Sequence, residues 1–169
     1  QTTPRGVDGL IAIAAPWPQP ALPVLVRING APAEVLYAGA TPGQIAGLMQ
    51  AAIDATVEHL SVRKQFGRPL GTFQALRHRM AECAVLAGGV RRLALKAAWT
   101  GDAGDAALAA LHAQDSATRV CYDVHQMLGA MGMTLEMPLH LWTYRMKALL
   151  SELGGRAGQA AAVAHYCFN

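Results

Sequence analysis

Charge is sparse in this 169-residue chain, because only 15% of its residues are Asp, Glu, Lys or Arg while 53% are hydrophobic. The 14 basic and 11 acidic residues give a net charge of +3, and the basic residues form no run of five or six. Nucleic acid is therefore not expected as a partner. A solitary domain of this size needs less apolar surface, so the surplus predicts burial against partner chains or a further domain.

Cysteine and metal-binding patterns are also scarce. The three cysteines form no CxxC pair, and the six histidines form no HxxxH or HExxH pattern, so we expect reduced thiols, a cytoplasmic location and no metal site. No uninterrupted apolar run approaches the length of a membrane span, and the first residues lack the pattern of a signal peptide. These absences predict a soluble, intracellular protein.

Residues 1–41 differ in character from the rest of the chain. Prolines and β-branched residues mark this segment, and the pieces LIAIA (residues 10–14) and PVLVRI (residues 23–28) predict two short strands. Asn29-Gly30 predicts a turn between the second strand and the piece EVLYA (residues 34–38). We assign residues 1–41 to a partial β and loop segment.

From Thr41-Pro42 onward the spacing of apolar residues predicts helices. Thr41 suits a helix cap and Pro42 the first helical position. Apolar residues at three- and four-residue steps predict helices over residues 42–64, from 72 for about seven turns, from about 106 to 129–132, and over 138–153 and 156–166. The expected fold is mainly α: an antiparallel helical bundle over residues 42–169, preceded by the short β segment.

Two sequence motifs within the predicted helical region are recognisable. RKQFGRPLGTFQ (residues 63–74) lies between the first two predicted helices, and HQMLGAMGMTLEMP (residues 125–138) follows the third. They resemble the RxQFGxxxxxFQ and QxxGGxGxTxExP blocks in the C-terminal helical domain of the acyl-CoA dehydrogenase family. The resemblance covers about two thirds of the chain and implies that residues 1–41 are the remnant of a middle β-domain. The chain is then a truncated member, an unusual short subunit or a partial record.

The resemblance implies that FAD is the cofactor. It places Arg63, Gln65, Phe66 and Gln74 against FAD, with Arg63 near the pyrophosphate, which a guanidinium can bind through two parallel hydrogen bonds. In the second block it places Gln126, Gly129 and Gly132 near the adenosine-diphosphate end. One departure is Gly129-Ala130, where the family has two glycines, so an added methyl group must be accommodated or the contact is weaker.

Each residue also has a simpler explanation when it is taken singly. The helix dipole favours an Arg at a helix C-terminus, and a Phe after a tight turn is typical of a core. Glu136 is better explained as a carboxylate that stabilises the following helix than as a substrate contact. Several methionines could line an acyl pocket, although ordinary packing is the favoured explanation for them: Met127, Met131, Met133, Met137 and Met146.

The catalytic base is missing from both of its expected positions. The family removes the α-proton of an acyl-CoA with a carboxylate while a hydride leaves the β-carbon for the flavin. In most members the base follows the fourth helix, at a position that corresponds to Gly154, and the nearest carboxylate is Glu152. In a minority the base comes from the first helix, near Tyr37, where the neighbouring acid is Glu34. The catalytic residue stays unknown, with Glu152 and Glu34 as candidates.

Two function hypotheses follow from these observations, and a third is less favoured. The first is an oxidoreductase that dehydrogenates an acyl-CoA substrate, with its base from Glu152, Glu34 or another segment. The second is a subunit that lacks a base and supplies FAD contacts and interface to a catalytic partner. The third is a helical bundle unrelated to flavin. The first two imply a homo- or hetero-oligomer with another acyl-CoA dehydrogenase subunit and leave open an electron-transfer flavoprotein as a partner.

Overall fold

The computed structural model describes residues 10–11, 24–25 and 33–168. Strand β1 (Leu10–Ile11) pairs antiparallel with β2 (Val24–Leu25), with Leu10 opposite Leu25. The two strands predicted at LIAIA and PVLVRI are thus confirmed at their described residues. The predicted Asn29-Gly30 turn lies outside the described residues.

Helix α1 (Ala33–Val62) starts earlier than the sequence indicated. The strand predicted at residues 34–38 is wrong, because these residues belong to the helix, and Pro42 lies inside it. Proline is typical of the first helical turn, which is why the predicted helix began there, although proline also removes a backbone hydrogen bond inside a helix. Thr41 and Pro42 are both buried, so packing against the bundle outweighs the local preference.

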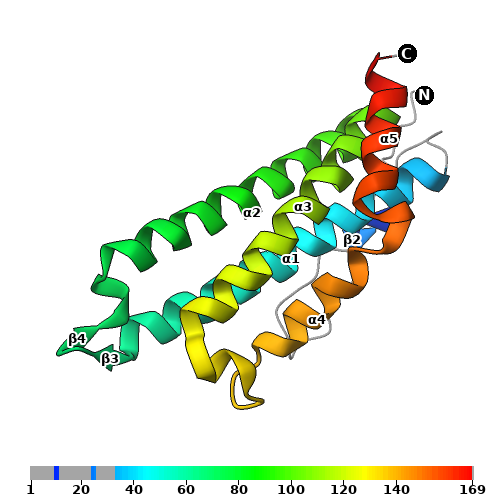
Figure 1. Ribbon diagram of the computed structural model, residues 1–169. Coiled ribbons are helices and arrows are strands. Elements are labelled where there is room, and N and C mark those ends of the chain that lie inside the picture. Colours follow the sequence, from blue (N-terminus) through cyan, green and yellow to red (C-terminus); the bar gives the residue numbers. More distant parts are fainter. Residues whose placement is uncertain (1–9, 12–23, 26–32, 169) are drawn as a thin grey trace, which may run out of the picture.

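The remaining elements confirm a mainly α bundle of five helices in the described part of the chain (Figure 1). A hairpin of β3 (Lys64–Gln65) and β4 (Arg68–Pro69) and the 3₁₀ turn η1 (Leu70–Thr72) connect α1 to α2 (Gln74–Thr100). Helix α3 (Ala103–Leu128) and the 3₁₀ turn η2 (Gly129–Met133) lead to α4 (Leu139–Leu149). The 3₁₀ turn η3 (Glu152–Gly154) then leads to α5 (Gly155–Phe168).

Two helix boundaries, the start of α3 and the end of α4, differ from the predicted ones for local reasons. Helix α3 begins at Ala103 because the Asp102 carboxylate accepts a hydrogen bond from the Asp105 N–H at 2.8 Å and so caps the helix. Helix α4 ends at Leu149, short of the predicted residue 153, because the chain there turns into η3. The predicted helices over residues 72–100 and 156–166 correspond closely to α2 and α5.

The core forms where α1, α2, α3 and α4 meet. Cys83 and Cys121 are buried and form no disulfide, and burial raises the pKa of each thiol to about 11. Both thiols therefore stay protonated at neutral pH and pack as small apolar groups. None of the helices in the described residues is both long and apolar enough to cross a membrane. The largest fully buried core side chains are apolar: Ile45, Met49, Val90, Val120, Val124, Leu139, Met146 and Leu149.

The connections fall at two separate places along the bundle (Figure 1). The β3–β4 hairpin and the η2 segment lie at one end, which we call the hairpin end. The α4–α5 turn (residues 150–154) lies away from that end, beside the part of α1 that contains Thr41. Because 21 residues separate Thr41 from Val62 and a helix rises 1.5 Å per residue, these two places are about 30 Å apart.

Candidate functional site

The RKQFGRPLGTFQ block forms a tight β-hairpin. Gln65 pairs with Arg68 across the turn, and the two turn residues, Phe66 and Gly67, have φ values of 55° and 80°. Two consecutive positive φ values are typical of turns that match the twist of antiparallel strands, although Asn-Gly is the usual sequence there. The Leu70 N–H donates to the Arg63 carbonyl at 2.8 Å and closes the loop.

Contacts on its inner side hold the hairpin to the bundle. A Cβ atom at Gly71 would lie 3.2 Å from the Leu60 carbonyl oxygen, a tight contact that favours glycine at this position. The Arg68 guanidinium carbon lies 4.1 Å from the Phe73 ring centroid, and the Phe66 ring packs edge-on against Phe73 at 6.1 Å. Arg68 was not among the predicted site residues, because an Arg five residues before a Phe carries no signal of its own.

The predicted FAD-binding residues of the first block point away from the core. Arg63, Gln65, Phe66 and Gln74 are all exposed, and Phe66 is 87% exposed. Among the described residues, no hydrogen bond or ion pair involves the side chains of Arg63, Gln65 or Gln74. The core explanation for Phe66 is therefore wrong. Phe66 thus combines two locally unfavourable features, a left-handed backbone and an exposed aromatic ring.

The second block lies at the same hairpin end. Its two glycines allow backbone conformations and contacts that a side chain would hinder. Gln126 is exposed in the last turn of α3. Gly129 ends that helix with φ 59° and ψ −137°, a conformation that side chains disfavour. A Cβ atom at Gly132 would lie 3.1 Å from the His125 carbonyl oxygen, so Gly132 lets η2 pack on α3. Ala130 is exposed, so its added methyl group is accommodated without strain.

The methionines of the sequence analysis do not form one acyl pocket. Met127 and Met146 are buried in the core, and Met137 is packed against it. Met133 is 80% exposed in the η2 segment. Ordinary packing explains the buried ones.

The candidate base Glu152 is held at the α4–α5 turn by two helices. The Thr41 hydroxyl on α1 donates to Glu152 Oε2 at 3.4 Å, and Gln114 Nε2 on α3 donates to the Glu152 carbonyl at 3.0 Å. Gly154, at the family's usual position for the base, is exposed with φ 78° and has no carboxylate to offer. Thr41 is thus a partner of Glu152 and not the helix cap that the sequence indicated.

Both alternative positions for the base lie on one face of α1. Glu34 is seven residues before Thr41, which is two helical turns, and Tyr37 is one turn before Thr41. Since Thr41 contacts Glu152, the α4–α5 turn lies against the face of α1 that contains positions 34 and 37. The side chain of Glu34 lies outside the described residues. Position 34 is about 10 Å further along the helix axis than the contact at Thr41.

Comparison with known proteins agrees with this geometry. Residues 39–166 match the family described as "Acyl-CoA dehydrogenase, C-terminal domain". Acyl-CoA dehydrogenase FadE34 of Mycobacterium tuberculosis is 32% identical over 138 residues, which is 78% of this chain and 19% of that protein. The mitochondrial short-chain specific acyl-CoA dehydrogenase of Bos taurus is 36% identical over 100 residues, which is 56% of this chain and 24% of that protein.

The fold also matches a solved structure. The crystal structure of the ChsE4-ChsE5 complex from Mycobacterium tuberculosis superposes with a TM-score of 0.74 at 27% identity, covering 79% of this chain and 38% of that one. The chain spans only 19% and 24% of the length of the two relatives above. The domain match, the two blocks and the five-helix bundle agree, and the chain belongs to the acyl-CoA dehydrogenase family, as its C-terminal domain.

Proposed function

We propose that this chain is the FAD-holding helical domain of an acyl-CoA dehydrogenase, an oxidoreductase that acts on an acyl-CoA thioester. The observation that carries this proposal is the β3–β4 hairpin, which exposes Arg63, Gln65, Phe66 and Gln74. Phe66 does so from a left-handed conformation. When bound, FAD supplies the hydride acceptor for α,β-dehydrogenation. The residues that are present fit this cofactor, because they offer a cation, two amides and an aromatic face at one place.

Each residue has a distinct part in this proposal. The Arg63 guanidinium binds pyrophosphate oxygens through charge-assisted hydrogen bonds. The amides of Gln65 and Gln74 donate to phosphate or ribose oxygens without adding charge. The Phe66 ring covers an apolar surface of the cofactor, and Gln126, beside Gly129 and Gly132, donates at the adenosine-diphosphate end. All of these residues lie at the hairpin end.

The geometry supports an assembly of at least two chains. Arg63 and Glu152 lie at places about 30 Å apart along α1. Only a five-carbon ribityl chain separates the pyrophosphate of FAD from its flavin ring, and it spans far less than this distance. Arg63 of one chain therefore binds a flavin whose ring faces the α4–α5 turn of another chain. We further infer that the residues before α1 belong to the middle domain of the family, since α1 itself, from Ala33, is part of the helical bundle, and that the assembly is cytoplasmic.

A second candidate is a subunit that holds FAD but does not itself catalyse. The observation in its favour is Gly154, which occupies the expected base position in a left-handed conformation that disfavours Glu. In this case the α4–α5 turn would shape an interface, and a homologous partner would supply the carboxylate. The similarity to one chain of the ChsE4-ChsE5 complex supports a heteromeric assembly of this kind.

A turnover assay tests both candidates. The protein is purified alone and after co-expression with the product of a neighbouring gene, and each sample receives acyl-CoA thioesters of several chain lengths with an artificial electron acceptor. A yellow protein that turns over alone supports the first candidate. Turnover that requires the partner supports the second. A colourless protein in both preparations contradicts the proposal that this domain holds FAD.

Replacing Phe66 with Asn separates folding from cofactor binding. Asn favours the left-handed conformation, so we expect the midpoint of thermal unfolding to stay unchanged or rise slightly. We expect FAD affinity to fall about threefold to tenfold, since an aromatic contact contributes about 0.5–1.5 kcal/mol. Flavin fluorescence titration measures the affinity. Tyr166→Asn on α5, another exposed aromatic residue, is the control. Unchanged FAD affinity in Phe66→Asn would contradict the proposal that Phe66 contacts the cofactor.

A further inference from the structure

Gln114 is a polar residue in an apolar part of α3. It is only 2% exposed, and the neighbouring Ala113 and Ala117 are fully buried. Its Nε2 donates to the Glu152 carbonyl at 3.0 Å, while its Oε1 is buried without a partner among the described residues. An unpaired buried acceptor destabilises the fold, so stability alone does not account for a Gln at this position.

The turn that Gln114 contacts has little rigidity of its own. Gly154 and Gly155 follow Glu152 with φ values of 78° and 65°, and glycines confer the most backbone freedom of any residue. Among the contacts of Glu152 with the described residues, Gln114 on α3 donates to its carbonyl and Thr41 on α1 donates to its carboxylate. Backbone and side chain of the same residue are thus fixed by α3 and α1 respectively.

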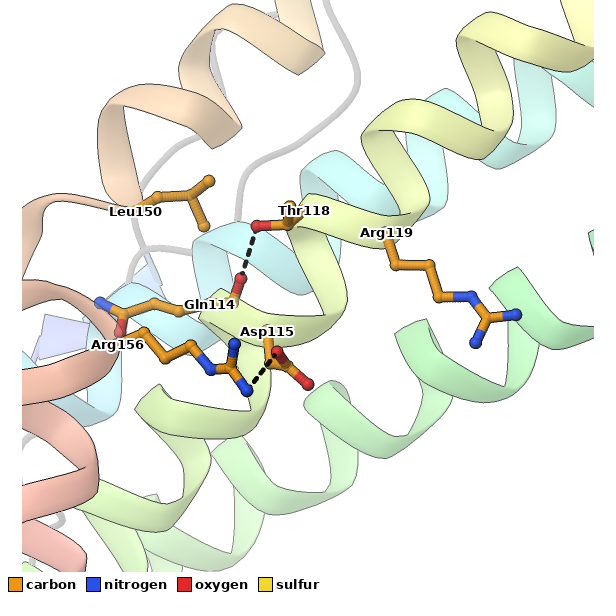
Figure 2. A pocket seen from close by; sticks show the side chains of 6 residues that line it. All are labelled: Gln114, Asp115, Thr118, Arg119, Leu150 and Arg156. Carbon is orange, nitrogen blue, oxygen red and sulfur yellow. Dashed lines mark hydrogen bonds and ion pairs between the residues drawn. The ribbon is translucent and has the colours of Figure 1, made fainter.

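A cavity lies directly behind this turn. It has a volume of about 320 Å³ and lies between α3, Leu150 of the turn and Arg156 of α5 (Figure 2). Arg156 and Asp115 form an ion pair of 3.3 Å beside it. Leu150 is the residue of the turn that lines this pocket, together with Gln114, so the turn is not tightly packed on this side.

We propose that Gln114 is a positioning residue, which fixes the α4–α5 turn so that Thr41 can orient the Glu152 carboxylate toward substrate. This inference rests on the proposed dehydrogenase function with Glu152 as base. Displacing a reacting group by about 1 Å can lower a rate about a hundredfold. The residue acts through Glu152, and no contact of Gln114 with substrate is required.

The test replaces Gln114 with Met, which has a similar shape but no donor. The Glu152 carbonyl keeps the Gly155 N–H as a partner, and the unpaired Oε1 is removed, so we expect the variant to fold with a similar unfolding midpoint. Anaerobic mixing of the complete protein, with its partner if one is needed, with acyl-CoA measures the limiting rate of flavin reduction. We expect that rate to fall tenfold to a hundredfold, while the half-saturating acyl-CoA concentration changes less than twofold.

The matched control is Thr118→Val, because Thr118 lines the same pocket, while its hydroxyl donates to the Gln114 backbone carbonyl and not to the α4–α5 turn. We expect the limiting rate of flavin reduction in Thr118→Val to match that of the wild type. An unchanged limiting rate in Gln114→Met, with the wild type active, overturns the positioning role and leaves the dehydrogenase proposal intact. If the wild type reduces no flavin, the dehydrogenase proposal fails first, and hydrogen exchange of residues 150–155 then decides. Exchange at least tenfold faster in Gln114→Met than in Thr118→Val supports the restraint, and equal exchange overturns it.

Discussion

Glu152→Gln is expected to slow flavin reduction by acyl-CoA by a factor of about 10²–10⁴, the usual effect of removing a general base. Gln keeps the shape of the side chain and an oxygen that can accept the hydrogen bond from Thr41. The fold and the FAD content should therefore stay unchanged, and only proton removal is lost. Anaerobic rapid mixing with acyl-CoA, followed at the flavin absorbance, measures the rate.

The controls for Glu152 separate the candidates. Glu136→Gln removes an exposed carboxylate shortly after η2 and should have no effect on the rate. Glu34→Gln tests the other candidate on the same face of α1. A rate that survives in Glu152→Gln and collapses in Glu34→Gln would assign the base to Glu34. A rate that survives in both variants would place the base outside these two residues, as the non-catalytic subunit requires.

Arg63→Ala is expected to weaken FAD binding about tenfold to a hundredfold. A hydrogen bond to a charged group contributes about 1.5–3 kcal/mol, and the Arg63 side chain has no hydrogen bond or ion pair among the described residues that its loss would break. The unfolding midpoint should therefore stay close to that of the wild type. Equilibrium titration of the apoprotein with FAD measures the affinity, and circular dichroism follows the fold.

Arg91→Ala is the matched control for Arg63, since Arg91 is also exposed but lies on α2, away from the hairpin. FAD affinity that falls equally in both variants would indicate a general charge effect. Because the pyrophosphate contact is electrostatic, the loss in Arg63→Ala should also shrink at high salt. Wild-type affinity in Arg63→Ala would contradict the placement of this residue at the pyrophosphate.

The spacing of apolar residues predicted most of the helices, because burial of one face dominates their stability. The start of α1 was missed, since the preference of Pro42 for a first turn is local and its burial is a property of the whole bundle. The two blocks identified the hairpin residues, but the exposure of Phe66 could not be read from the sequence. The same holds for the contacts of Glu152, whose partners Gln114 and Thr41 are 38 and 111 residues away along the chain.

The separation of about 30 Å between Arg63 and Glu152 also determines which site of an assembly a mutation disables. Under the proposed function, the hairpin of each chain binds an FAD whose flavin ring faces the α4–α5 turn of another chain. An altered copy then damages a site in which the other chain is intact. In a pair of one altered and one intact chain, a hairpin change therefore disables the site at the intact chain's turn, whereas a Glu152 change disables the site at its own turn, and one site survives in either case.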